Sequence, residues 1–491
     1  MLTATPAPDA FMLAPDQLLD LGLLIALFHV VLAPAAGLHA MLYKRDSRAA
    51  FGWIAMCVLL PVAGPILYML LGINRIRRRA RRLEWPRLRI GHERGRPSRA
   101  AVDRPDVANG GASDLASVGE RLSRHRLTAG NAVTPLANGD EAYPAMLEAI
   151  DTAQRSVFLG SYIFDGDATG HSFVSALEQA LERGVDVRVV VDGIGEFYGR
   201  PRIGRLLARA GVPFARFLPP RLLPPQLSLN LRNHHKILVV DGHTAFTGGM
   251  NIGDRHVIGS EPRRGAAADL HFRIEGPAAI QLETEFLRTW AFCSGDDRPP
   301  PPVQALPTGP VAARAITDGP DEDLDQLTML LASTIAAARE RIDIITPYFL
   351  PPREIVASLQ AAALRGIRVR LVLPAENNLP FVHWASRNML WELLFHGIEV
   401  VEQPPPFAHT KLLLIDEAYV QVGSTNWDCR SLRLNFELQV ELFDERLAGT
   451  LRERFDRTFD GARPITLAEV DGRSLPARLR DAACWLFTPY L

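Results

Sequence analysis

The hydrophobic pattern separates an apolar N-terminal part from a long region of short alternating segments. Residues 18–42 are mostly apolar, and residues 51–71 carry no charge. Each segment has about 20 residues or more, enough for a helix to cross a hydrocarbon core of roughly 30 Å. Because the connector between them is short, the sequence predicts a two-helix transmembrane hairpin over residues 17–73, after an N-terminal tail at 1–16. Two buried core helices are the alternative interpretation.

Charge on either side of the hairpin predicts its orientation. The arginine-rich segment 74–82 outweighs the basic residues of the connector, Lys44, Arg45 and Arg48. The positive-inside rule therefore places the residues after the hairpin in the cytoplasm, although the connector favours the opposite orientation. An arginine run beside a span predicts a stop-transfer anchor that also attracts anionic lipid, with nucleic-acid binding as the alternative. Residues 74–130, rich in Arg, Pro, Gly and Ser, predict a basic linker with room for a helix.

Beyond the linker, short apolar runs alternate with segments of helical periodicity. The predicted strands are 156–164, 185–191, 342–349 and 368–373, and the predicted helices are 143–153, 172–183, 202–210, 324–341, 355–364 and 384–396. Strand–helix–strand alternation predicts parallel pairing with right-handed crossovers, and hence an α/β fold class. The pattern breaks at a proline run near residue 300 and then restarts. We therefore expect two tandem α/β domains, 131–305 and 306–491, packed as a pseudo-twofold pair.

Composition narrows the class of protein. A chain of 491 residues that is 47% hydrophobic and 22% charged fits globular domains with a membrane part. The formal net charge of -1 argues against a generally basic nucleic-acid binder. The four cysteines are scattered without a CxxC pair, so we expect neither a zinc site nor a disulfide framework. The apolar closing segment 485–491 either docks on the second domain or touches the membrane surface.

Two copies of one motif carry the candidate chemistry. In each copy a His and a Lys stand two residues apart, so on a strand their side chains leave the same face. Four apolar residues then lead to an Asp, and a glycine-containing turn that ends in Asn follows. The residues are His234, Lys236, Asp241, Gly248 and Asn251 in the first copy, and His409, Lys411, Asp416, Ser424 and Asn426 in the second. An imidazole beside a fixed ammonium is suited to binding a phosphate ester and reacting with it.

Two imidazoles that face one phosphate suit a two-step displacement without a metal. One His attacks phosphorus and forms a phosphohistidine, while the other protonates the leaving alkoxide and then deprotonates the incoming alcohol. The lysines stabilise charge on the phosphoryl oxygens. The two Asn side chains add neutral donors, from turns in which Gly248 and Ser424 let the backbone come close. Asp241 and Asp416 end their strands, so a structural turn is an alternative to a direct role in the chemistry.

A nucleophilic His also needs an acceptor that orients its second ring nitrogen. Glu437 lies in an apolar strand, where an acid is costly to bury without a purpose, and Asp269 occupies a comparable place after the first motif. We expect Asp269 to orient His234 and Glu437 to orient His409.

At these residues the chain resembles the phospholipase D superfamily, whose signature is a duplicated HxKx4D followed by GSxN or GGxN. It is also similar to one branch, the bacterial cardiolipin synthases. The similarity to the branch lies in the hairpin segments 50–54 and 60–68, in Thr346–Pro351, and in the segments 426–431 and 434–437. Two departures are Gly249, where the second copy has Ser424, and Ala268, where relatives often carry an aromatic residue.

The resemblance implies a phosphatidyl transfer in which two phosphatidylglycerol molecules give cardiolipin and glycerol. His234 would be the nucleophile and His409 the general acid and base, although the symmetry of the two motifs alone does not assign them. Phosphatidylethanolamine could serve as a second lipid substrate. The resemblance further implies no cofactor, metal or nucleic acid, and a multi-pass location in the bacterial inner membrane with cytoplasmic catalytic domains. The alternatives are a phospholipase D that releases phosphatidic acid, a nuclease of the same superfamily, and a non-catalytic membrane scaffold.

Overall fold

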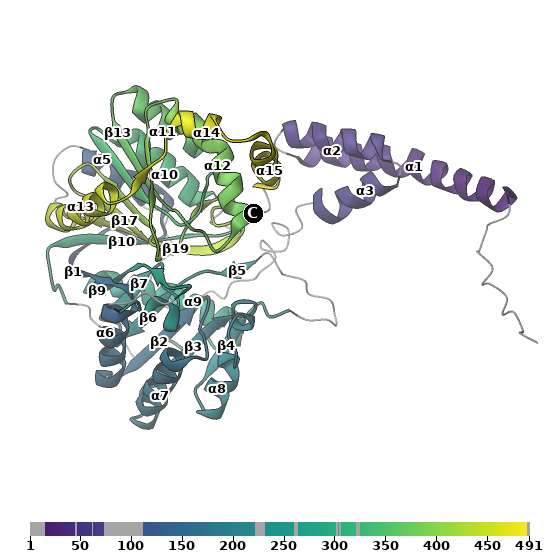
Figure 1. Ribbon diagram of the computed structural model, residues 1–491. Coiled ribbons are helices and arrows are strands. Elements are labelled where there is room, and N and C mark those ends of the chain that lie inside the picture. The colour runs from purple at the N-terminus through teal and green to yellow at the C-terminus, as the bar shows by residue number, and fades with distance from the viewer. Residues whose placement is uncertain are drawn as a thin grey trace, which may run out of the picture. The chain divides into compact units, whose positions relative to one another are not determined.

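The computed structural model forms two compact units, residues 1–79 and residues 80–491 (Figure 1). The residues that it describes are 15–44, 47–60, 62–72, 111–220, 231–259, 264–300, 303, 306–320 and 325–488. The arginine-rich segment 74–82 and the last three residues of the chain, two features that the sequence singled out, lie outside this part.

Helices make up the described part of the N-terminal unit. They are α1 (Pro15–Tyr43), α2 (Ser47–Leu59), α3 (Ala63–Leu67) and the π-helical turn η1 (Tyr68–Gly72). Small alanines of α1 pack with Cys57 of α2 and with Tyr68, whose hydroxyl lies 2.8 Å from Nδ1 of His39. Close packing of α1 on α2 confirms two neighbouring helices in the predicted region.

The expectation of one continuous helix over 51–71 is wrong. The helix ends at Leu59 and restarts at Ala63. Between them Val62 has a φ of 61°, a conformation that a β-branched residue rarely adopts, and the preceding residue is a proline, which cannot donate a backbone hydrogen bond. Among the described residues, no helix is both long enough and apolar enough to cross a membrane.

The second unit is built on a 16-stranded sheet in which seven strands of each repeat follow the same order. The second repeat adds β20 at its edge, and the short β5 (Arg232–Asn233) pairs with β19. From the centre outwards, the first repeat contributes β1 (Thr128–Ala137), β9 (Leu270–Glu275), β7 (Thr244–Gly248), β6 (Ile237–Val240), β2 (Ser156–Ser161), β3 (Asp186–Asp192) and β4 (Phe214–Phe217). The second contributes β10 (Val311–Asp318), β19 (Asn435–Phe443), β17 (Tyr419–Gly423), β16 (Leu412–Ile415), β11 (Arg341–Ile345), β13 (Arg368–Pro374), β14 (Glu399–Gln403) and β20 (Arg463–Pro464). The antiparallel pair β1–β10 joins the repeats, which confirms the pseudo-twofold arrangement.

Parallel pairing is confirmed for the outer strands only. β2, β3 and β4 run parallel, as do β11, β13 and β14. The inner strands β6, β7 and β9 and their equivalents pair antiparallel. A tight turn joins β6 to β7 and β16 to β17, and longer segments lead on to β9 and β19. The predicted strand 342–349 is also split, since β11 ends at Ile345 and the short β12 (Phe349–Leu350) follows Pro347.

Helices cover the sheet and bury its apolar side chains. In the first repeat they are α6 (Asn138–Thr152), α7 (Ala168–Glu182), α8 (Ile203–Arg209) and α9 (Pro277–Ser294). In the second they are α10 (Gln326–Ala337), α11 (Arg353–Leu364), α12 (Pro380–Leu394), α13 (Glu445–Asp460), α14 (Leu467–Asp471) and α15 (Leu475–Leu486). Each repeat has its own large core, and each fully buried Val, Leu, Ile or Phe stabilises the fold by roughly 1.5–3 kcal/mol.

Part of the predicted linker belongs to the second repeat. Helix α5 (Gly111–Leu122), blue in Figure 1, lies among the green elements of that repeat and adds Leu115 to its core. Gly119 of this helix faces the guanidinium of Arg314, where a side chain at 119 would collide. Arg314 is fully buried and donates from Nε to Glu441 over 2.9 Å. The linker prediction is therefore wrong for residues 111–122.

Candidate active site

Two short strands, one before each motif histidine, cross to the other repeat. β5 (Arg232–Asn233) pairs in parallel with β19 of the second repeat, and β15 (Phe407–Ala408) pairs in parallel with β8 (Ala267–Ala268) of the first. The backbone N–H of His234 donates to the Phe436 carbonyl over 2.9 Å, and that of His409 donates to the Ala268 carbonyl over 2.7 Å. In each strand pair, the residue that follows the accepting carbonyl on the partner strand is acidic.

Each imidazole is consequently bound to the carboxylate of the opposite repeat. Nδ1 of His234 lies 2.9 Å from Oε2 of Glu437, and Nδ1 of His409 lies 2.8 Å from Oδ2 of Asp269. Both predicted acids do orient a histidine, but the predicted pairing is wrong. The two possible pairings are equivalent in a duplicated sequence, and only the crossing of β5 and β15 distinguishes them.

Burial keeps the first imidazole neutral and its acid ionised. Burial lowers the pKa of His234 to about 4, although the charge of Glu437 acts in the opposite direction. Burial alone would raise the pKa of Glu437, but His234 and Lys236 lower it to about 2. At neutral pH the Nδ1–H of His234 therefore donates to a carboxylate, and its Nε2 keeps the lone pair that a nucleophile needs.

The two lysines bring positive charge into the same buried space. Nζ of Lys236 donates to the His234 carbonyl over 2.8 Å, and Nζ of Lys411 donates to the His409 carbonyl over 2.6 Å. Burial lowers the pKa of Lys236 to about 7 and that of Lys411 to about 8. Burial, Lys411, Lys236 and His234 together lower the pKa of His409 well below 6.5. An anion such as a phosphodiester would relieve this concentration of cationic groups.

One residue in each glycine-containing turn determines how the nearby acid is accommodated. Ser424, predicted to bind phosphate, instead donates its hydroxyl to Glu437 and accepts from the Leu438 N–H. At the equivalent position Gly249 leaves no room for a side chain, because an added Cβ would lie 2.7 Å from both carboxylate oxygens of Asp269. Residues 249 and 424 therefore differ because the side chain of Asp269 is shorter than that of Glu437.

Other turn residues bond to, or pack against, groups of the protein itself. Oδ1 of Asn251 accepts from the Ile163 N–H over 3.1 Å, and Nδ2 of Asn426 lies 3.3 Å from the hydroxyl of Ser431. Gly248 has a φ of 154°, and an added Cβ there would lie 2.7 Å from the Leu270 carbonyl. These contacts explain the residue types in the turns, and a contact of Asn251, Asn426 or Gly248 with phosphate stays a prediction.

Asp241 and Asp416 act as turn clamps. The Asp241 carboxylate accepts from the N–H groups of Gln154, Arg155 and Ser156, and the Asp416 carboxylate accepts from those of residues 339–341. Both residues have a positive φ, 54° and 47°. They follow the C-terminal ends of β6 and β16, whereas the motif lysines precede the N-terminal ends of the same strands. The geometry supports the structural alternative and not a direct catalytic role.

Comparison with known proteins places this geometry in a family. The family described as cardiolipin synthase, phospholipase D-like domain matches residues 146–290 and 331–459, which is more than half of the chain. The chain belongs to this family. A second family, described as phospholipase D-nuclease N-terminal, matches residues 23–72. The resemblance seen in the sequence is thus confirmed.

Individual relatives agree with the family assignment. The chain is 30% identical over 482 residues to the major cardiolipin synthase ClsA of Bacillus subtilis, covering 96% of this chain and 99% of the relative. It is 28% identical over 461 residues to a cardiolipin synthase of Oceanobacillus iheyensis, with 92% and 95% covered. The crystal structure of a phosphatidylserine synthase from Haemophilus influenzae superposes with a TM-score of 0.57 at 13% identity, covering 77% of this chain and all of the other, which shows a shared fold.

Sequence reasoning missed the aromatic rings of the phospholipase D-like site. The Tyr162 ring lies edge-on to His234 at 4.9 Å between centroids, and Tyr348 lies edge-on to His409 at 6.4 Å. The buried ring of His256 lies 6.1 Å from that of His409. A tyrosine shortly after the equivalent strands β2 and β11 was the available signal, but an aromatic residue beside a strand is more often core.

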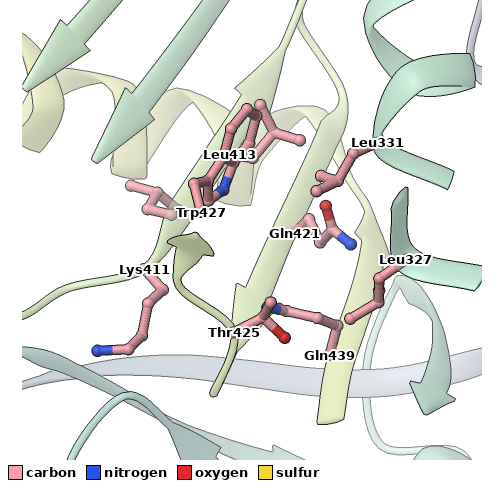
Figure 2. A pocket seen from close by; sticks show the side chains of 9 residues that line it. Leu327, Leu331, Lys411, Leu413, Gln421, Thr425, Trp427 and Gln439 are labelled. Atoms are coloured by element: carbon pink, nitrogen blue, oxygen red, sulfur yellow. The ribbon is translucent and has the colours of Figure 1, made fainter. Parts of the chain in front are cut away.

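Two small cavities lie beside the phospholipase D-like motifs. One cavity of about 10 Å³ lies behind Lys411, between Leu327, Gln421 and Gln439, and has room for about one water molecule (Figure 2). Figure 2 shows the Lys411 ammonium pointing away from Gln421. Another cavity, of about 80 Å³, lies behind Asp269. No cluster of His, Cys, Asp and Glu among the described residues could hold a metal ion, and the expectation that no metal takes part stays a prediction.

We predict that Asp241→Ala lowers the free energy of unfolding by about 2–4 kcal/mol, because three hydrogen bonds to a carboxylate are lost at a left-handed position. Urea unfolding of the full chain measures this. Asp416→Ala should have a similar effect, and Asp241→Asn, which keeps an acceptor and tolerates the backbone, a smaller one. Unchanged stability with lost turnover in Asp241→Ala would return Asp241 to the chemistry.

We predict that Glu437→Gln disturbs His234 and leaves the tautomer of His409 intact. The ring of His234 should lose its fixed Nδ1–H form, and turnover should fall by about 10²–10⁴-fold. Nitrogen NMR of ¹⁵N-histidine-labelled protein reports the ring protonation of each residue. Asp269→Asn is the matched control and should disturb His409 instead. The reversed pattern would show that each acid serves the histidine of its own repeat.

Proposed function

We propose that this protein is a cardiolipin synthase, a phosphatidyltransferase that converts two phosphatidylglycerol molecules into cardiolipin and glycerol. The observation that carries the proposal is the pair of carboxylate-bound imidazoles, each with a buried lysine beside it. Such a site offers one nucleophile, one proton carrier and cationic groups for a phosphodiester. Membership in the cardiolipin synthase family supports the same reaction.

In the first step Nε2 of His234 attacks phosphorus, and the bond from phosphorus to the glycerol oxygen breaks. His409 donates a proton to that oxygen, and glycerol leaves. The bound phosphodiester favours the protonated form of His409, because its negative charge offsets the cations that lower this pKa in the empty site. The ionised Glu437 stabilises the cationic phosphohistidine.

In the second step His409 takes the proton from a hydroxyl of the second phosphatidylglycerol. The oxygen attacks phosphorus, the bond to His234 breaks, and cardiolipin forms. Differences between the two acids support these roles. Ser424 and Asn435 both donate to Glu437, which keeps it anionic. Burial raises the pKa of Asp269, so the pair that it forms with His409 holds a proton more readily.

Exclusion of water would favour transfer over hydrolysis. The side chains of His234 and His409 are only 9% and 12% exposed, so little solvent reaches the phosphohistidine. Purified protein in micelles with labelled phosphatidylglycerol and no divalent metal tests the reaction. Cardiolipin and glycerol would support the proposal, and phosphatidic acid as sole product would make the protein a phospholipase D. Labelled phosphatidylethanolamine, added as a second lipid, shows whether it serves as donor or acceptor.

We predict that His234→Ala and His409→Ala each reduce cardiolipin formation by at least about 10³-fold, because either substitution removes one of the two proton or phosphoryl carriers. Thin-layer chromatography of the labelled lipids measures it. His171→Ala, which changes an exposed histidine of α7, is the control and should remain active. Near-normal turnover in either catalytic variant would contradict the two-histidine mechanism.

We predict a bell-shaped pH dependence of kcat/KM for the free enzyme. Activity should rise as His234 loses its proton, with a pKa of about 4, because only the neutral imidazole attacks. It should fall as His409, whose pKa lies well below 6.5, and then Lys236, with a pKa of about 7, lose their protons, because His409 then cannot protonate the leaving oxygen and a neutral amine no longer stabilises the phosphoryl oxygens. A rate profile across this range at saturating and subsaturating lipid measures both limbs. Rising activity above pH 8 would contradict the role of Lys236.

We also infer that the enzyme works at the bacterial cell membrane, with its catalytic unit on the cytoplasmic side. The apolar helices before residue 73 and the arginines after it support this location. Protease treatment of spheroplasts before and after lysis tests it, because a cytoplasmic catalytic unit is cut only after lysis.

A further inference from the structure

Apolar side chains are exposed at equivalent places in the two repeats. After β3, Phe197 and Tyr198 are 48% and 60% exposed. After β13, Leu379 and Phe381 are 47% and 61% exposed. Both segments follow the carboxyl ends of parallel strands, where α/β sheets place their ligands.

A tyrosine connects each exposed segment with a catalytic histidine. Tyr162, edge-on to His234, also contacts Tyr198 with 6.2 Å between ring centroids. Tyr348, edge-on to His409, donates its hydroxyl to Oδ1 of Asn378 over 2.7 Å. Asn378 immediately precedes Leu379. The exposed segments therefore begin at the rim of the active site on both sides of the pseudo-twofold axis.

Helix α15 carries an apolar stripe on its solvent side. Leu475, Leu479 and Leu486 are 66%, 62% and 70% exposed, and their spacing places them on one face. The buried positions of this helix include the charged Asp481 together with Cys484. Burial of a carboxylate beneath exposed leucines is the reverse of the usual arrangement in a soluble domain.

α15 lies next to the exposed rim segment of the second repeat. It packs on α12, where the guanidinium of Arg480 lies 4.4 Å from the centroid of the Trp384 ring. The Trp384 ring in turn contacts Phe381, with 5.5 Å between centroids. Phe381 is one of the exposed rim residues, so these three side chains connect the rim to α15, whose leucines are exposed to solvent.

Arginines accompany the apolar side chains in both repeats. The guanidinium of Arg202 lies 4.0 Å from the centroid of the Phe197 ring, and the neighbouring Arg200 is exposed. On α15, Arg478 is exposed among the leucines, whereas the guanidinium of the partly exposed Arg480 pairs with the buried Asp481. Exposed leucines and aromatic rings beside arginines match the interface of an anionic bilayer, where apolar groups enter the acyl boundary and guanidinium groups meet phosphates.

We propose that this surface, which we call the rim face, docks the catalytic unit onto an anionic lipid bilayer. The rim face consists of Phe197, Tyr198, Leu379, Phe381, Leu475, Leu479 and Leu486. It lets a lipid phosphate reach His234 and His409 while the acyl chains stay in the membrane. The inference rests on the proposed function, because it takes the substrate to be a membrane phospholipid.

The test replaces Leu475, Leu479 and Leu486 together by Ser in the full chain. Turnover is measured on phosphatidylglycerol vesicles and on short-chain phosphatidylglycerol below its critical micelle concentration. The variant should show a roughly 10-fold higher apparent KM on vesicles, because buried apolar area is lost, and an unchanged kcat/KM on the monomeric lipid. Leu364→Ser is the matched control, since Leu364 of α11 is 75% exposed and precedes the opposite end of β13.

The outcomes separate the two proposals. A wild-type protein that turns over neither lipid would refute the proposed function. An active wild type with a variant unaffected on vesicles, or equally impaired on both lipids, would overturn the rim face alone. In nanodiscs, hydrogen exchange of residues 475–487 should be slower with phosphatidylglycerol than with phosphatidylcholine, independently of turnover. If the leucine variant instead splits an oligomer, the occupant of this face is a second copy of the chain, and the bilayer proposal fails.

Discussion

The exchange of carboxylates between the repeats is the constraint on which the rest of the structure depends. His234 is oriented by Glu437, and His409 by Asp269, so neither repeat contains a complete site. A separate repeat would leave its histidine and its acid without the partners that the other repeat supplies. The β1–β10 pair and the crossed strands β5 and β15 hold the repeats in the one register that satisfies both acids. Fold and catalysis thus require the same interface.

The two repeats differ at one pair of equivalent positions in the site, 249 and 424. Ser424 donates to the longer acid Glu437, whereas Gly249 leaves space for the shorter Asp269. The shorter acid brings its carboxylate against the turn backbone, and the longer one needs a hydroxyl to hold it. One pair is thereby kept anionic, and burial makes the other more proton-rich. Two different roles, nucleophile and proton carrier, can arise from a duplicated motif in this way.

The sequence predicted the features that nearby residues determine, and it did not predict those that depend on contacts between residues far apart in the chain. The outer strands and helices follow from short apolar runs and helical periodicity, and the motif residues stand out because they occur twice. The partner of each histidine was not predictable, because pairing within or between repeats is equivalent in the sequence. The role of Asp241 as a clamp depends on three N–H groups that lie far away in the chain. The docking of α5 depends on space above Arg314 that only the folded sheet creates.

The buried lysines and the rim face can be understood together. Burial weakens the charge on Lys236 and Lys411, so the empty site is unfavourable to the cations that it needs. The negative charge of a phosphodiester would stabilise the protonated lysines. A phospholipid, however, cannot leave the membrane to reach a closed, largely dry site. Exposed apolar side chains at the rim would let the headgroup enter while the acyl chains remain in lipid. Both the donor and the incoming alcohol would then arrive from the bilayer, and this shared route would favour phosphatidyl transfer over hydrolysis because water does not follow it.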